Sequence, residues 1–485
     1  MKRRTKILAT LGPSSDDPKV LDKMIESGLD VARLNFSHDA HEVHKNRAEV
    51  ARNRARAHGR QIGIVVDLQG PKIRIEKFTN GSVELYDGDR FILDPNHDPD
   101  AGSTERVGIA YKELPNDVQR GDTLLLNDGR IVLWVEEVVG CEVRCRVTVG
   151  GELSNRKGIN KQGGGLSAPA LTDKDRQDIL AAADIDADYL AVSFVRNAED
   201  VYEARRLFRE AGGKGGIIAK VERAEALDVL DDIIEASDAI MVARGDLGVE
   251  IGDEALPPVQ KDMISKARTM NRVVITATQM MESMIENPIP TRAEVFDVAN
   301  AVLDGTDAVM LSAETAVGKF PDKVIAAMDR ICRGVEEQRA VTKSDHRIDT
   351  TFDFVDEAIA MATMYTANHL GVKAIAALTE SGSTALWMSR ISSGIPIYAM
   401  TRQVDTRRKV TLYRGVYPVS FELTTENHAQ VNKDAIDELV RRGAVRDGDL
   451  VVITKGDLMG SHGGTNAMKI VEVGNMPDPE GSIIE

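Results

Sequence analysis

Short apolar runs alternate with helical patterns at the start of the chain. Lys6–Leu11, Asp30–Phe36 and Gln61–Leu68 are short and mostly apolar, which predicts buried strands. Between the first two, Asp17–Gly28 carries apolar residues at helical spacing, and a long Arg- and Ala-rich helix precedes the third. Strands that alternate with helices in this way form βα units, so we expect a parallel sheet.

The pattern changes between about residues 71 and 165, where helical spacing almost disappears. Short alternating runs separated by Asp-Gly and Gly-Gly turns predict a small antiparallel β domain inserted into the βα series. Gly163–Gly165 is the expected exit hinge of this insert. The predicted strands are Ser82–Tyr86, Arg90–Leu93, Thr123–Leu126, Ile131–Val135 and Glu142–Val149.

The βα series then resumes with five more predicted strands. The helix before the last of them begins with a capping box at Thr291–Glu294 and ends at Gly305. Three strands before the insert and five after it make eight, which favours a (β/α)8 TIM barrel. The five are Tyr189–Phe194, Gly216–Val221, Ala239–Ala243, Arg272–Ala277 and Asp307–Leu311.

From about residue 345 a helix and four further strands predict an open α/β domain. The helix is Phe352–Leu370, and the strands are Ala374–Leu378, Ile397–Met400, Val416–Phe421 and Leu450–Thr454. We therefore expect a barrel over residues 1–70 and 166–344. Residues 71–165 would form the inserted β domain, and residues 345–485 the open α/β domain.

Composition narrows the function classes. The 485 residues are 42% hydrophobic and 28% charged, as in ordinary globular proteins, and the net charge of −16 argues against nucleic acid or an anionic membrane surface as a partner. Only Cys141, Cys145 and Cys332 are present, too few for a disulfide framework. With no apolar run of membrane-spanning length, the sequence predicts a cytoplasmic protein.

Polar side chains gather where the predicted barrel strands end, and chemistry in such barrels occurs at that rim. Lys220 and Glu222 share one face of a strand end. Alone, such a pair is usually a solvated ion pair. The other strand ends supply acids, cations and hydroxyls that solvation does not explain, namely Arg33, Asn35, Ser37, His38, Asp67, Ser193, Gly245, Asp246, Thr278, Ser312 and Glu314.

These residue types suit chemistry on a phosphate. Glu222 and Asp246 could bind Mg²⁺ or Mn²⁺ and leave positions open for substrate oxygens. Arg33, Lys220 and, from the insert, Arg74 could balance the charge of a transferring phosphoryl group. The rim therefore predicts a site for a phosphorylated carboxylic acid.

Three features allow two interpretations each. His38 is the only rim histidine, and packing or solvent contact explains it as well as ligand contact does. Lys157 could reach a phosphate from the insert or be a surface lysine. The run Ser381-Gly382-Ser383-Thr384 between a strand and a helix could bind a phosphate or form only an N-cap turn.

The chain resembles the pyruvate kinase family over nearly its whole length, insert and C-terminal domain included. The segments that carry the resemblance are Thr5-Lys6-Ile7 with Gly12-Pro13-Ser14-Ser15, Ala32–His38, Ile218–Glu222, Met241–Gly248, Ala277–Met284 and Pro290–Glu294. The resemblance implies transfer of the phosphoryl group of phosphoenolpyruvate to ADP, giving pyruvate and ATP, the last step of glycolysis.

The resemblance also implies roles for individual residues. Lys220 would stabilise the phosphoryl group in flight and the enolate, and Arg33 would contact the phosphate. The implied roles of the others are Mg²⁺ or Mn²⁺ binding by Glu222 and Asp246, carboxylate binding by Gly245, Asp246 and Thr278, nucleotide binding by Asn35, Phe36, Ser37, His38, Arg74 and Lys157, and, for Ser312 and Glu314, a place near the water network that protonates the enolate.

One loop departs from the pattern of many family members. Those members read Asp-Thr-Lys-Gly-Pro-Glu after the third strand and need K⁺, whereas this chain has Asp67 at the start of the run and Lys72 at its end. Lys72 puts an ammonium where those members rely on a monovalent cation. We expect activity without K⁺, although Asn35, Ser37 and Asp67 keep part of the cation pocket.

The resemblance implies that the barrel is the catalytic domain and that the insert, residues 71–165, is a small β-barrel lid. It also implies that the C-terminal domain, residues 345–485, is allosteric and that the protein is a homotetramer. Ser381, Gly382, Ser383 and Thr384 would bind a phosphorylated effector, and the neighbouring Glu380 favours a sugar monophosphate or AMP over fructose 1,6-bisphosphate. Two other functions compete with this one. One is another phosphoenolpyruvate-using barrel, a lyase or mutase, and the other is a non-catalytic metabolite sensor.

Overall fold

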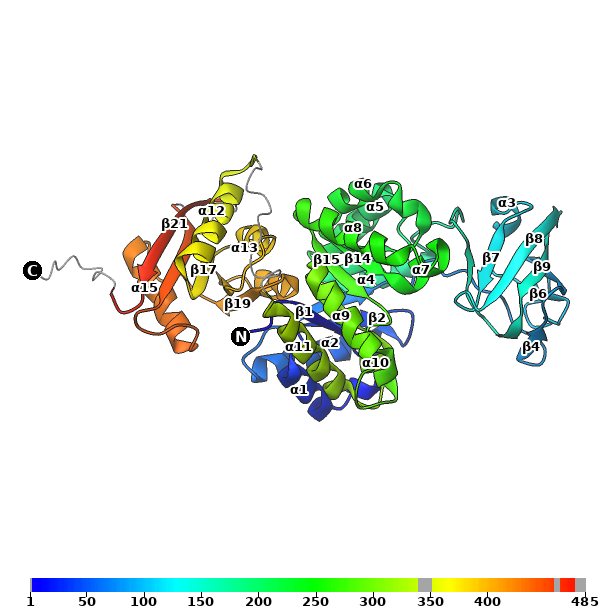
Figure 1. The fold of residues 1–485 in the computed structure, drawn as a ribbon, viewed down its shortest axis with the longest axis horizontal. Helices are drawn as coiled ribbons and strands as arrows, with labels where there is room; N and C mark the ends of the chain where they lie inside the picture. Colours follow the sequence, from blue (N-terminus) through cyan, green and yellow to red (C-terminus); the bar gives the residue numbers. More distant parts are fainter. Residues whose placement is uncertain (1, 339–350, 458–462, 476–485) are drawn as a thin grey trace, which may run out of the picture.

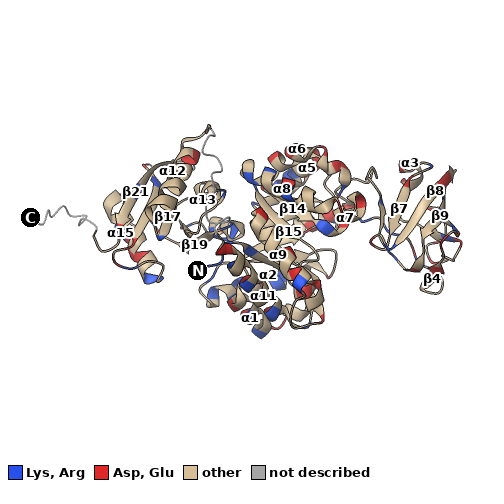
Figure 2. Cartoon of the chain, in the orientation of Figure 1, with Lys and Arg blue, Asp and Glu red and all other residues tan. Residues whose placement is uncertain are grey.

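The chain folds into three bodies arranged in a row (Figure 1). The computed structural model describes residues 2–338, 351–457 and 463–475. A barrel lies in the middle, the insert lies on one side of it in cyan, and the C-terminal domain lies on the other side in yellow to red. Acidic and basic positions are interspersed over all three bodies (Figure 2).

Eight parallel strands form the closed barrel, as predicted. They run around it in the order β1-β16-β15-β14-β13-β12-β3-β2. Nearly every strand residue is buried, because side chains face either the barrel interior or the surrounding helices. The strands are β1 (Lys6–Thr10), β2 (Val31–Asn35), β3 (Gly63–Asp67), β12 (Tyr189–Val192), β13 (Gly216–Val221), β14 (Ala239–Ala243), β15 (Val273–Ala277) and β16 (Ala308–Leu311).

The helices of the barrel cover its outside. The predicted capping box of α9 is present, since Thr291 Oγ1 accepts from Glu294 N and Glu294 Oε2 accepts from Thr291 N. Gly305 ends that helix with a φ of 96°. The helices are α1 (Pro18–Ser27), α2 (His41–Ala57), α4 (Asp173–Asp184), α5 (Ala198–Glu210), α6 (Leu230–Ala236), α7 (Arg244–Ile251), α8 (Leu256–Thr269), α9 (Arg292–Asp304), α10 (Ala313–Ala316) and α11 (Pro321–Glu336), with short 3₁₀ helices η1 (Pro13–Ser15), η2 (Ala224–Leu227) and η3 (Glu282–Ile285).

The insert is a β domain around its own apolar core. Six strands form a sheet in the order β11-β7-β8-β9-β5-β6, and β10 pairs with β4. Single bridges from Arg74 to Gly158 and from Ile75 to Ile109 join the two edges of the larger sheet, in keeping with the predicted small barrel. The β5–β6 pair is parallel, whereas an antiparallel domain was expected. The elements are β4 (Ser82–Leu85), β5 (Arg90–Asp94), β6 (Arg106–Gly108), α3 (Leu114–Asp117), β7 (Thr123–Leu126), β8 (Ile131–Val139), β9 (Glu142–Val149), β10 (Gly151–Ser154) and β11 (Ile159–Lys161).

One buried carboxylate anchors both chain segments that connect the insert to the barrel. Asp175 Oδ1 accepts from the backbone N–H of Gly70, where the chain leaves the barrel, at 3.0 Å. Its Oδ2 accepts from the N–H of Thr172, where the chain returns, at 2.9 Å. Gly163, Gly164 and Gly165 all have φ between 78° and 90°, a conformation that favours glycine at the predicted exit.

The C-terminal domain is an open α/β sheet in the order β19-β18-β17-β20-β21. The predicted strands are parallel, and β21, which was not predicted, adds to one edge antiparallel to β20. The predicted domain boundary after residue 344 lies outside the described residues. The elements are α12 (Val355–Leu370), β17 (Ala374–Leu378), α13 (Ser383–Ser389), β18 (Ile397–Thr401), α14 (Val404–Lys409), η5 (Val410–Leu412), β19 (Val416–Ser420), α15 (His428–Arg441), β20 (Leu450–Gly456) and β21 (Thr465–Glu472).

Buried ion pairs join the C-terminal domain to the barrel. Arg390, at the end of α13, forms a two-pronged pair with Asp307 just before β16, and both side chains are 1% exposed. The same guanidinium donates to the carbonyl of Arg272 at 2.6 Å. Arg408 pairs with Asp188 at 2.8 Å. In the part of the chain that the structure describes, no helix has the length and apolarity needed to cross a bilayer.

The first prediction concerns the Arg390–Asp307 pair. Arg390→Leu leaves the Asp307 carboxylate buried without its cation, which costs about 3–5 kcal/mol. We expect the first unfolding transition in scanning calorimetry to move to clearly lower temperature. Arg206→Leu is the matched control, because it breaks the exposed Arg206–Glu210 pair and should leave the transition unchanged. Equal transitions for the two variants would contradict a stabilising role for the buried pair.

Candidate active site

The Lys220 ammonium is the centre of the barrel rim. Lys220 is the fifth residue of the six-residue strand β13 and is 8% exposed. Its Nζ donates to Ser193 Oγ at 2.6 Å and lies 3.0 Å from Glu222 Oε1 and 3.2 Å from Asp67 Oδ1. These partners follow or belong to three different strands, so the predicted gathering of Lys220, Glu222, Asp67 and Ser193 is confirmed.

Burial and pairing compete in setting the charges of this cluster. Burial disfavours the ammonium, but Asp67 and Glu222 outweigh it and raise the pKa of Lys220. Burial also opposes ionisation of Asp67, yet Lys220 and Arg33 hold the pKa of Asp67 below its ordinary value. Burial raises the pKa of Glu222, and the negative charge of Asp246 raises it further, whereas Lys220 lowers it. The net effect is a raised pKa. Lys220 therefore stays charged at neutral pH.

Arg33 is held beside the same carboxylate. Its Nε donates to Asp67 Oδ2 at 2.6 Å, and its Nη1 donates to Thr10 Oγ1 at 2.8 Å. The guanidinium is therefore fixed at the rim with donors remaining for an anion. Thr10 was not among the predicted site residues. Its place as the last residue of β1 is the signal that could have identified it.

Thr278 and Gly245 meet across the ends of β15 and β14. The backbone N–H of Gly245 donates to Thr278 Oγ1 at 2.9 Å, and this hydroxyl donates to the carbonyl of Ala277 at 2.6 Å. Asp246 follows Gly245 in the first turn of α7, where backbone N–H groups have no partner within the helix. The predicted neighbours Gly245, Asp246 and Thr278 thus form one corner of the rim.

The donor set of the rim fits a divalent cation. Asp246 lies close enough to Glu222 for its negative charge to raise the pKa of Glu222, a repulsion that a metal ion between them would remove. Glu222 Oε2 is oriented by the N–H of Phe194 at 2.8 Å. No cluster of three or more His, Cys, Asp or Glu able to hold a metal occurs within the described residues. The two carboxylates would therefore need substrate or water oxygens to complete the coordination.

Lys72 lies nearer to the metal-competent acids than the sequence indicated. It was expected to replace a monovalent cation beside Asn35, Ser37 and Asp67. In the structure its Nζ lies 3.1 Å from Asp246 Oδ1. Asp246 lies in the first turn of α7, so this contact joins the start of the insert to that helix.

The predicted nucleotide-facing residues differ in accessibility. Ser37 and His38 are exposed beyond the end of β2, whereas the Phe36 ring is 2% exposed and stacks on His44 with ring centres 4.6 Å apart. Phe36 could therefore face a nucleotide only through its backbone. In the insert, Arg74 is exposed and donates to the carbonyl of Arg156, and Lys157 is half-buried.

Both carboxylate oxygens of Glu314 accept hydrogen bonds from backbone N–H groups. Oε2 accepts from Ser312 at 2.7 Å and Oε1 from Met281 at 3.2 Å, so the side chain ties the loop after β15 to the loop after β16. Burial raises the pKa of Glu314 above its ordinary value. Ser312 remains half-buried at the rim.

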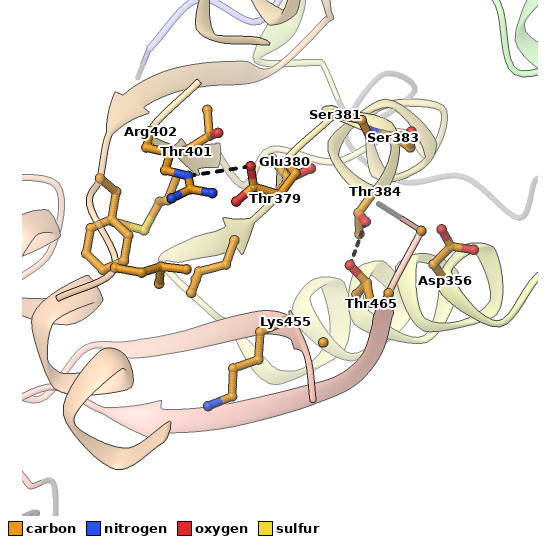
Figure 3. Close-up of a pocket in the computed structure, with 17 residues that line it drawn as sticks. Asp356, Thr379, Glu380, Ser381, Ser383, Thr384, Thr401, Arg402, Lys455 and Thr465 are labelled. Atoms are coloured by element: carbon orange, nitrogen blue, oxygen red, sulfur yellow. Dashed lines mark hydrogen bonds and ion pairs between the residues drawn. The ribbon is translucent and has the colours of Figure 1, made fainter. Parts of the chain in front are cut away.

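A separate pocket lies in the C-terminal domain (Figure 3). The segment Ser381–Thr384 contributes to it, with Gly382 in the left-handed conformation at φ 85° and the hydroxyls of Ser381 and Ser383 2.8 Å apart. Glu380 faces Arg402 at 3.9 Å, and Lys455 adds a second cation from β20 (Figure 3). The predicted effector residues therefore line or adjoin a real pocket.

The chain is similar to known proteins over nearly its whole length. The family model of the pyruvate kinase barrel domain matches residues 2–325, and that of the pyruvate kinase alpha/beta domain matches residues 357–471. The chain is 57% identical to pyruvate kinase II of Salmonella typhimurium over 475 residues, which is 97% of this chain and 99% of the relative. It is 55% identical to a pyruvate kinase of Buchnera aphidicola over 97% of this chain and 99% of the relative.

A pyruvate kinase of Haemophilus influenzae is 53% identical over 94% of this chain and 96% of its own length. The matches extend across the barrel, the insert and the C-terminal sheet, so they cover every body described above. The family models together match most of the chain, and the identities to these relatives are above half. The chain belongs to the pyruvate kinase family.

Proposed function

We propose that the protein transfers the phosphoryl group of phosphoenolpyruvate to ADP and releases pyruvate and ATP. The proposal rests on the Lys220 ammonium, which is buried at the rim within 3.2 Å of Glu222, Asp67 and Ser193. A permanent cation in a water-poor site stabilises charge that develops during transfer. Membership of the pyruvate kinase family supports the same reaction.

In this reaction an oxygen of the ADP β-phosphate attacks the phosphorus of phosphoenolpyruvate. The bond from phosphorus to the enol oxygen breaks and leaves its electron pair on the enolate. Lys220 would balance the charge of the phosphoryl group and then of the enolate oxygen, while Arg33 holds the phosphate. The N–H groups of Gly245 and Asp246 and the Thr278 hydroxyl would bind the substrate carboxylate.

Members of the pyruvate kinase family use a divalent metal. Here Glu222 and Asp246 would hold it, with Mg²⁺ as our choice and Mn²⁺ as a substitute. Bound there, the ion would neutralise charge on the oxygens of the substrate. Glu222 is already oriented by the Phe194 N–H, which limits the reorganisation needed on binding.

The enolate must gain a proton at its terminal carbon to become pyruvate. We assign Ser312 to the edge of the water network that supplies this proton. Glu314 would act by fixing the loop of Ser312, because its two oxygens already accept backbone N–H groups.

The insert would close over the site as a lid. Closure would bring Arg74 and Lys157 toward the ADP phosphates, which the backbone of residues 35–38 would meet from the barrel. The alternative assignment to another phosphoenolpyruvate-using lyase or mutase is not favoured, because the pyruvate kinase models match both the barrel and the C-terminal domain.

We also propose a phosphorylated effector for the C-terminal pocket and a homotetrameric assembly. The hydroxyls of Ser381, Ser383 and Thr384, with Gly382 between them, suit one phosphate. Exposed Phe296 on α9 and Phe354 beside α12 offer apolar surface for copies of the chain. The free thiols in the chain support a reducing location, the cytoplasm.

The second prediction tests the reaction itself. Lys220→Met removes the cation at the reacting phosphoryl group, so turnover in a coupled assay of ADP-dependent pyruvate release should fall at least about 10²-fold. Lys45→Met is the matched control, because it breaks only the exposed Lys45–Asp184 pair. Retained turnover in a folded Lys220→Met enzyme would remove Lys220 from the mechanism.

The third prediction concerns monovalent cations. Because Lys72 supplies an ammonium at the rim, the wild-type enzyme should work fully in K⁺-free buffer. Lys72→Glu should lose activity in that buffer and regain it when K⁺ is added. Lys77→Glu, which reverses the charge of another lysine of the insert that pairs with Asp100, should behave like wild type. A wild-type enzyme that depends strongly on K⁺ would refute this assignment.

The fourth prediction concerns the effector. At low phosphoenolpyruvate, a sugar monophosphate or AMP should raise the rate and lower the half-saturating phosphoenolpyruvate concentration. Glu380 repels a second phosphate, so Glu380→Gln should improve the response to fructose 1,6-bisphosphate. Glu472→Gln, at an exposed position at the end of β21 outside the pocket lining, should not. Activation of the wild type by fructose 1,6-bisphosphate alone would overturn the choice of effector.

A further inference from the structure

The turn after β15 has a strained backbone at the rim. Thr278 has φ 69° and Gln279 has φ 55°, both in the left-handed region. A β-branched residue such as threonine rarely adopts this conformation, because its side chain crowds the backbone. Two successive non-glycine residues in this conformation persist only where the surrounding structure holds them.

The Arg244 side chain supplies that support. It is 7% exposed and reaches from the start of α7 to the carbonyls of the strained turn. Nε donates to the carbonyl of Ala277 at 3.2 Å, and Nη2 donates to that of Thr278 at 2.6 Å. A guanidinium presents its donors in a rigid plane, so it can hold two successive carbonyls in a fixed orientation.

Arg244 is itself anchored from a third element. The Asp297 carboxylate on α9 accepts from Nη1 at 2.6 Å and from Nη2 at 2.8 Å, a two-pronged ion pair. Gln260 Oε1 on α8 lies 3.4 Å from Nη1. The guanidinium is thus fixed between α9, α8 and the turn, and it has little freedom to follow a displaced loop.

Arg244 also positions the start of α7, on the other side of the rim corner formed by Gly245, Asp246 and Thr278. Arg244 is the first residue of α7, directly before Gly245 and Asp246. The N–H of Gly245 donates to the Thr278 hydroxyl at 2.9 Å, which joins the two loops at the atoms assigned to the substrate carboxylate. A shift of the guanidinium would therefore move both the hydroxyl and the N–H donors.

We propose that Arg244, anchored by Asp297, is a positioning residue for phosphoenolpyruvate that holds the strained Thr278 turn against the start of α7. This inference rests on the proposed function, since it assigns the corner to the substrate carboxylate. Arg244 touches no substrate atom in this assignment. Its loss should weaken phosphoenolpyruvate binding and turnover and leave the nucleotide side of the site, at residues 35–38, unchanged.

The fifth prediction separates positioning from general stability. Arg244→Lys keeps the charge but cannot span two carbonyls and a carboxylate. We expect kcat/KM for phosphoenolpyruvate to fall about 10²-fold, the size of effect that a small misplacement produces. The KM for ADP should change less than about twofold, because the ADP contacts lie on other strands. Asp297→Asn should show the same selective effect more weakly.

The matched control is Arg205→Lys. Arg205 also donates to a carboxylate, Asp238, and to a carbonyl, that of Ala236, but lies on α5 away from the rim. It should leave both KM values unchanged. Added guanidinium ion should partly restore kcat/KM for phosphoenolpyruvate in Arg244→Ala and have no such effect on wild type.

Equal losses for phosphoenolpyruvate and ADP, or no loss in a folded Arg244→Lys enzyme, would overturn the proposal. If that variant does not fold, Asp297→Asn decides, and an unchanged KM for phosphoenolpyruvate would refute the role. Calorimetric titration of the enzyme with phosphoenolpyruvate in the presence of Mg²⁺ distinguishes a failure of the proposed function from a failure of the positioning role. A wild type that binds phosphoenolpyruvate without making ATP contradicts the proposed function, whereas equal binding by wild type and Arg244→Lys contradicts the positioning role.

Discussion

A buried ammonium that must remain paired is the constraint on which the barrel rim depends. Lys220 can stay charged away from water only because Asp67 and Glu222 lie within 3.2 Å of it. Asp67 in turn needs Arg33, and Glu222 needs the N–H of Phe194. Glu222 directly follows β13, the strand of Lys220, whereas Asp67, Arg33 and Phe194 lie on or after β3, β2 and β12, so the charges are balanced only when these strand ends are in their observed register.

The same principle extends from the reaction site to the domain contacts. Charges that leave water are matched across elements distant in sequence, as in Arg390 with Asp307 and Arg408 with Asp188. α13 begins in the C-terminal pocket and ends next to Arg390, whose partner lies just before β16. Strand β16 leads to the loop of Ser312. These contacts connect the pocket and the rim through a continuous series of elements.

Local patterns in the sequence were sufficient for the barrel, the insert and the open sheet, because apolar periodicity and caps such as Thr291–Glu294 act over a few residues. The rim residues could also be predicted, because they lie where the predicted strands end. The sequence could not indicate that Lys72 reaches Asp246, or that Arg244 supports Thr278, because those partners are set by loop geometry. Strand β21 was missed because only two of its eight residues are buried, which leaves little apolar pattern.

Asp175 has a consequence for how the chain folds. Its carboxylate holds the N–H groups of Gly70 and Thr172, so the insert leaves and rejoins the barrel at nearly one point. Within the insert, the bridge between Arg74 and Gly158 also brings its two ends together, so β3 pairs with β12 as if a short loop joined them. The barrel therefore bears little of the entropic cost of closing a long loop. The length of the insert can vary with little effect on the stability of the barrel.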